Sequence, residues 1–208
     1  ECYIPNAGVV STSGNRNVLI GDSTGVKLTT GIANVFIGYK AGFLTTNAVG
    51  NVFIGSEAGE SNTTGTNNTF VGTQAGRLNT GINNVFVGTE AGENNSSGRA
   101  NTFIGEEAGP NNTTGRDTDY DDQFSYLTDG VGYSNTTGDA NTLIGAGAGT
   151  DVITGSANTF VGHAAGANTP FSSESTFVGA FAGWDNNRTN QQDNALRNNY
   201  FGFAAGGT

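Results

Sequence analysis

The sequence is poor in several residue types that most globular domains use. Its 208 residues include no Met, one Cys, one Trp, one His and three Pro, and only 12% of them are charged. A single Cys excludes an intrachain disulfide. We expect Cys2 to be either a small buried side chain or an intermolecular partner for another chain. The eight Lys and Arg are scattered, so they form no basic patch of the kind that binds nucleic acid.

Long apolar runs are missing as well. No stretch approaches the ~18 consecutive apolar residues that a membrane-spanning helix requires. The net charge of −10 argues against binding to an anionic membrane surface. A chain that starts at Glu1 rather than Met is expected to be a processed mature chain or a fragment. These features predict a protein that does not bind nucleic acid and does not insert into a membrane.

Glycine, with 34 residues, and phenylalanine, with 13, are abundant and recur at fixed spacing. The repeating unit has 17 residues, N-[TV]-F-[IV]-G-x-x-A-G-x-x-N-T-T-G-x-x. Its regular apolar positions argue against disorder, and the lack of a Gly-X-Y period excludes collagen. Two longer spacings place insertions near 116–123 and 186–197 in a single domain spanning 1–208. The second Gly of each unit lies at Gly8, Gly25, Gly42, Gly59, Gly76, Gly92, Gly109, Gly132, Gly149, Gly166, Gly183 and Gly206.

The unit predicts an all-β fold. It is too short for a pair of helices, and each interior Gly would cost a helix about 1 kcal/mol. Phe, Ile, Val and Thr favour strands, and Gly favours turns with positive φ. We therefore expect a parallel β-solenoid (β-roll) of about 12 coils of 17 residues, stacked about 4.8 Å apart. Each coil would carry a strand at N-[TV]-F-[IV] and a weaker second strand at x-x-N-T-T, with stacked Asn side chains linking the coils.

Two apolar columns run along this predicted stack. Phe and the following Ile or Val are neighbours in the strand, so they point to opposite faces. A thin roll has one interior, so one column faces outward and should be buried against other copies of the chain. The alternative is a wider, three-sided coil that encloses both columns. We assign self-association to the aromatic column, Phe36, Phe53, Phe70, Phe86, Phe103, Phe160 and Phe177.

The unit N-T-F-[IV]-G-x-x-A-G-x-x-N-T-T-G-x-N resembles the head repeats of trimeric autotransporter adhesins. It is also similar to the N-T-A-[IV]-G-x-x-A-L-x-x-N-T-T-G repeats of bacterial surface proteins and phage tail-fibre-like proteins. The similarity covers about 7–206. It implies a trimeric β-roll, export from the cell, and a role in adhesion or fibre building. This chain carries Phe where the adhesin repeats carry Ala, so its packing must differ.

The repeat favours a non-enzymatic structural protein, secreted or on the cell surface. We expect its partner to be itself, as a trimer or as an end-to-end filament, because the repeat runs to both termini without a cap. The alternative is a trimeric adhesin or receptor-binding rod that recognises surface glycans. Its support is the two insertions, the second of which has amides and an Arg beside Trp184. Ice binding is a minor alternative, suggested by the column Thr12, Thr29, Thr46, Thr63, Thr80, Thr113 and Thr136.

Few residues suggest site chemistry. Asp117, Asp119 and Asp121 alternate in the first insertion, which predicts either a solvated acidic loop or a calcium site. No other cofactor is expected. His163 lies in a turn, and no Ser-His-Asp or Cys-His arrangement accompanies it. The sequence therefore does not predict an enzyme.

Overall fold

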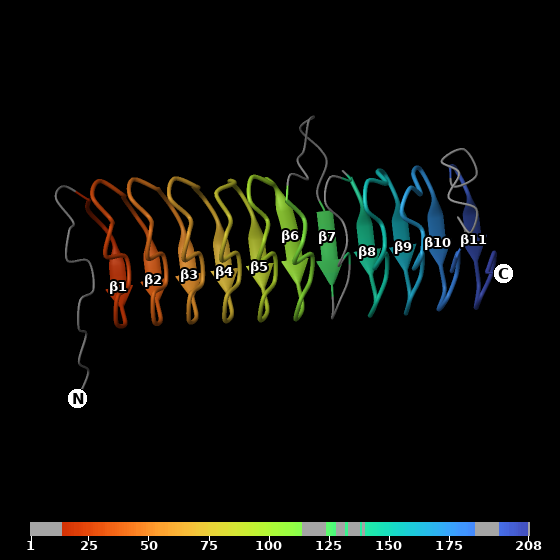
Figure 1. Ribbon diagram of the computed structural model, residues 1–208, viewed down its shortest axis with the longest axis horizontal. Coiled ribbons are helices and arrows are strands. Elements are labelled where there is room, and N and C mark those ends of the chain that lie inside the picture. The colour runs from red at the N-terminus through yellow and green to blue at the C-terminus, as the bar shows by residue number, and fades with distance from the viewer. Residues whose placement is uncertain are drawn as a thin grey trace.

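The computed structural model describes residues 14–113, 124–127, 132, 138, 140–185 and 196–207. They form one parallel sheet of eleven short strands in chain order, which runs the length of a rod (Figure 1). This confirms the predicted all-β parallel solenoid. The first of the roughly twelve expected coils falls in 1–13, outside the described residues. The strands are β1 Val18–Ile20, β2 Val35–Ile37, β3 Val52–Ile54, β4 Thr69–Val71, β5 Val85–Val87, β6 Asn101–Ile104, β7 Phe124–Leu127, β8 Thr142–Ile144, β9 Thr159–Val161, β10 Thr176–Val178 and β11 Asn199–Phe201.

The strands pair so that equivalent repeat positions lie side by side. Phe53 of β3 is opposite Phe70 of β4, and Ile54 is opposite Val71. The same register continues where the spacing lengthens, since Thr176 of β10 pairs with Asn199 of β11. The insertions therefore leave the strand register unchanged.

The predicted second strand is wrong. In the coil of β3, the corresponding segment forms turns in which the Asn62 amide donates to the Gly59 carbonyl (3.0 Å). The Ser61 amide donates to the carbonyl of Arg77 in the next coil (2.8 Å), so the coils remain hydrogen-bonded there. Left-handed backbone at Gly59 (φ 58°) bends the chain into the turn. This geometry overrides the weak strand preference of Asn and Thr.

The aromatic column fills the interior, so its assignment to self-association is wrong. Each of the seven Phe rings is 0% exposed, and successive rings stack with centroids 4.5–4.9 Å apart and planes within 5–7°. The Ala-Gly turn folds back over this face. A Cβ on Gly59 would lie 2.6 Å from the ring of Phe53. We call these seven side chains, Phe36, Phe53, Phe70, Phe86, Phe103, Phe160 and Phe177, the Phe stack.

The three-sided alternative is wrong too, because the Ile and Val column lies outside the coil. Ile20, Ile54 and Ile104 are 36–40% exposed. The interior holds the Phe stack together with small Ala side chains such as Ala58, which are 0% exposed. One apolar column is therefore buried by the chain itself, and the other is not.

Buried Asn side chains link the coils. The Oδ1 atom of Asn51 accepts from the Asn68 backbone amide of the next coil (2.9 Å). The Nδ2 atom of Asn51 donates to the Gly65 carbonyl of the same coil (2.8 Å). The stacked Asn side chains are also hydrogen-bonded to one another, as expected, since Nδ2 of Asn51 donates to Oδ1 of Asn34 in the preceding coil (3.3 Å). The Asn ladder comprises Asn17, Asn34, Asn51, Asn68, Asn84, Asn101, Asn141 and Asn158.

Replacing Asn51 with Leu should lower the free energy of unfolding by about 2–6 kcal/mol. The change leaves the Asn68 amide and the Gly65 carbonyl buried without these partners, and each such group costs about 1–3 kcal/mol. Urea unfolding followed by circular dichroism measures the loss.

Asn62 provides a matched control for this substitution. It is also 0% exposed, but neither amide atom of its side chain has a hydrogen-bond partner among the described residues. Thr45 occupies the equivalent position one coil earlier, and its Oγ1 donates to the Asn62 carbonyl (2.7 Å). Asn62→Thr should therefore raise the free energy of unfolding by about 1 kcal/mol. Equal losses in the Asn51 and Asn62 variants would contradict a specific role for the ladder.

Candidate functional site

The first candidate surface is the outer face of the sheet. It consists of the two side chains that flank the central residue of each strand and point away from the core. Within the described residues it carries no charged side chain. Val18 and Ile20 are 45% and 39% exposed. Its members are Val18, Ile20, Val35, Ile37, Val52, Ile54, Thr69, Val71, Val85, Val87, Thr102, Ile104, Thr142, Ile144, Thr159, Val161, Thr176, Val178, Asn199 and Phe201.

Eleven strands at a spacing of about 4.8 Å make this face roughly 50 Å long. Parallel sheets are almost always covered on both faces. In the described part of the chain only the inner face is covered, through the Ala-Gly turns. The outer face is therefore the surface where another molecule would complete the usual packing.

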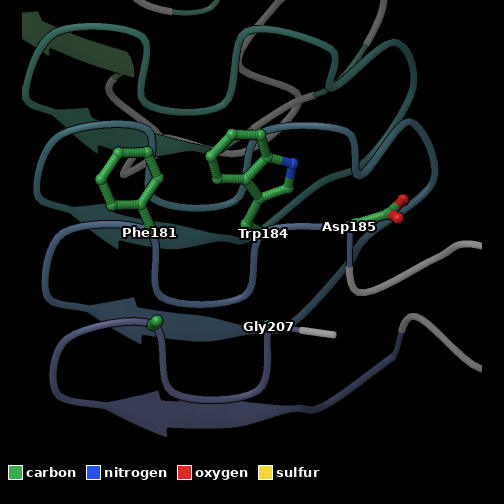
Figure 2. A pocket seen from close by; sticks show the side chains of 5 residues that line it. Phe181, Trp184, Asp185 and Gly207 are labelled. Carbon is green, nitrogen blue, oxygen red and sulfur yellow. The ribbon is translucent and has the colours of Figure 1, made fainter.

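The second candidate surface lies beside β10 and β11. It is a pocket of about 430 Å³ lined by Phe181, Trp184, Asp185, Ala204 and Gly207 (Figure 2). The rings of Phe181 and Trp184 stack with centroids 5.0 Å apart and planes at 19°. In Figure 2 both rings lie on the side of their coil away from Gly207. We call this site the aromatic pocket.

Two further aromatic rings adjoin Phe181. Phe203 packs edge-on against it at 5.9 Å and is 79% exposed. His163 packs edge-on at 5.2 Å from the preceding coil. Trp184 and His163 were considered from the sequence, whereas Phe181 and Phe203 were missed. At the equivalent turn positions most other coils carry small, polar or charged residues. An aromatic residue at such a solvent-facing position is the signal that could have identified Phe181 and Phe203.

A polar chain holds Trp184 in place. With the Asn168 amide in the orientation that its neighbours require, its oxygen accepts from the indole N–H of Trp184 (3.0 Å). Its nitrogen donates to Oδ2 of Asp151 (2.9 Å). Asp151 and Asn168 occupy equivalent positions in successive coils. The only indole donor is thus used within the protein, and the ring orientation is set before any ligand arrives.

The other predicted site residues fall outside this geometry. Cys2 lies in 1–13, and Asp117, Asp119 and Asp121 lie in 114–123, so all four are outside the described residues. In the part of the chain that the structure describes, no three His, Cys, Asp or Glu side chains group as a metal site would require. The calcium site and the intermolecular cysteine stay predictions.

The Thr column has a structural role. The hydroxyl of Thr46 donates to the Thr63 carbonyl of the next coil (3.1 Å). The hydroxyl of Thr80 does the same to Ser96 (2.6 Å). These bonds help to join the coils, and ice binding stays a prediction.

Charged side chains form pairs between neighbouring coils, away from the aromatic pocket. The hydrogen bond and charge of Arg197 lower the pKa of Glu174 (Nε to Oε2, 2.7 Å). The pKa of Lys40 is raised, first by its electrostatic interaction with Tyr39 and then by Glu60. Because these pairs are solvent-exposed, they contribute little to stability.

Comparison with known protein families, with curated proteins and with solved structures finds no match to this chain. Among the described residues, no helix has the length and apolar character needed to cross a membrane.

Proposed function

We propose that the chain is a non-enzymatic structural rod that associates sideways with copies of itself, in a fibre or surface layer outside the cell. The observation that carries this proposal is the uncovered outer face of an all-parallel sheet, which presents Val, Ile or Thr in nearly every described row. A location outside the cell rests on the resemblance of the repeat.

A second copy of the chain is the occupant that best fits the outer face. The face is long, flat and uniform, and a partner with the same spacing between rows matches it along its whole length. Closed symmetry about the rod axis buries all such faces at once, so a trimer is the form that we expect first.

Replacing Ile54 and Val87 together by Lys should convert the associated form to monomers. A charged side chain in an apolar interface leaves an unpaired charge there, which costs several kcal/mol. On a free rod the same residues are solvent-accessible, so each change should cost at most about 1 kcal/mol of folding stability. Sedimentation velocity over a range of concentrations measures the assembly state.

The control is a double variant with the same change in charge, Thr64→Lys with Ser97→Lys. Both residues are exposed in turns, outside the sheet, and this variant should assemble like the original chain. A chain that sediments as a monomer at every concentration would contradict lateral association. So would equal dissociation of the two double variants.

A second candidate function is a receptor-binding rod. One observation favours it, namely that the aromatic pocket is confined to the coils of β9 to β11. The repeat has small, polar or charged side chains at most of the equivalent positions. Exposed aromatic residues contribute nothing to the core of the rod. Ligand binding therefore explains their presence better than folding stability does.

A further inference from the structure

Phe181 departs from the repeat in a way that costs stability. It stands in the turn after β10 with a left-handed backbone, φ 58°. A bulky residue rarely adopts this conformation, and strained residues of this kind cluster at binding sites. The equivalent residues of other described coils are small, polar or charged: Ser23, Lys40, Glu57, Gln74, Glu90, Glu107, Gly147, Ala164 and Ala204.

The neighbours of Phe181 and Trp184 leave space around their rings. Ala204 and Gly207 occupy the corresponding positions of the next coil, and Ala164 and Ala167 those of the preceding coil. At these corresponding positions only hydrogen or methyl groups flank the two rings, while His163 and Phe203 pack edge-on against Phe181. The two rings are nearly parallel, with planes at 19°, so they do not enclose a ligand from several sides.

The rim of the pocket supplies hydrogen-bond acceptors. Gly207 has no side chain, and a Cβ there would lie 3.8 Å from the Trp184 carbonyl oxygen and 3.7 Å from that of Phe181, which also accepts from the Trp184 backbone amide (3.2 Å). Asp185 also lines the pocket, and its carboxylate points away from the two rings in Figure 2. Among the described residues no Lys or Arg lines the pocket, and the chain has a net charge of −10.

We propose that the aromatic pocket binds a neutral sugar ring of a polysaccharide or glycan. The C–H face of a pyranose ring packs on the exposed aromatic rings, and its hydroxyl groups donate to carbonyl oxygens at the rim. Acidic sugars are repelled by Asp185 and the net negative charge. An organic cation needs rings on several sides to be held well, and among the described residues only Phe181 and Trp184 are aromatic residues that line the pocket.

This inference rests on the second candidate function, the receptor-binding rod, and is independent of lateral association. Trp184 is the only Trp of the chain, so intrinsic fluorescence reports directly on the pocket. The full chain is titrated with hexasaccharides of cellulose, chitin, laminarin and mannan, with oligogalacturonate and with choline chloride. We expect a saturable change in emission with at least one neutral hexasaccharide and none with the acidic or cationic probes.

The test variant is Phe181→Ala, which introduces the residue that Ala164 and Ala204 provide in the adjacent coils and keeps the fluorescent Trp184. Loss of a central aromatic contact should weaken binding about tenfold or more. The matched control is Phe43→Ala, because Phe43 occupies the position of Trp184 in the coil of β2. This control should bind as the original chain does.

Retention on the corresponding insoluble polysaccharides separates the possible failures. Retention that Phe181→Ala leaves unchanged would overturn the pocket while the receptor-binding function stands. No retention and no response to any neutral sugar would overturn both. A response to choline or oligogalacturonate alone would also overturn the assignment to neutral sugar. The monomeric Ile54→Lys with Val87→Lys variant should still bind, which separates this test from the test of lateral association.

Discussion

Replacing Phe70 by Ala is expected to lower the free energy of unfolding by about 3–5 kcal/mol. The ring is 0% exposed and lies between those of Phe53 and Phe86, at 4.9 and 4.8 Å. Its loss removes buried apolar area and two ring contacts, and it leaves a cavity in a coil that has little else to fill it. Chemical unfolding followed by circular dichroism measures the effect.

Phe70→Leu is the control for this prediction. Leu143 occupies the same place in β8 and is 0% exposed, so the repeat accommodates Leu at this position. We expect a loss below about 1.5 kcal/mol, as for other swaps of similar volume. If Phe70→Ala costs no more than Phe70→Leu, the Phe stack is not the main source of stability in the rod.

The second large effect is expected for Gly72→Ala. The backbone at Gly72 has φ 139°, a region that only Gly adopts readily. A methyl group there would also clash with the Gly88 carbonyl oxygen of the next coil. Backbone strain of about 1–3 kcal/mol and steric overlap of about 1–3 kcal/mol together predict a loss of about 2–6 kcal/mol. The melting temperature and the denaturant midpoint should fall together.

Two nearby residues show why this position is special. Gln74, two residues on, also has a positive φ (57°), but there the backbone is in the ordinary left-handed region that a polar side chain tolerates. Thr73 is exposed, so Thr73→Ala should change stability by less than about 0.5 kcal/mol. A loss for Gly72→Ala as small as that for Thr73→Ala would contradict the role assigned to the close approach of the coils.

The aromatic pocket shows how far the repeat could predict a site. Trp184 was considered as a glycan-binding residue because it is the only Trp and adjoins an insertion. Phe181 was not recognised, because its functional interest comes from a left-handed backbone and from the small residues above and below it. The left-handed backbone recurs at this turn position in other described coils, whereas the small neighbours depend on which coils become adjacent. The spacing of 23 residues that places Ala204 beside Phe181 differs from the regular period.

The sequence by itself determined the repeat, the parallel stacking, the position of one strand in each coil and the role of Asn as a link between coils. These follow from local chemistry, since side-chain alternation, Gly turns and a constant period act within one unit. Only the tertiary structure decided which apolar column is inside. Alternation shows that Phe53 and Ile54 face opposite ways, but the direction in which the Ala58–Gly59 turn closes selects Phe for the core. That choice moved the surface available for association from the Phe stack to the outer face.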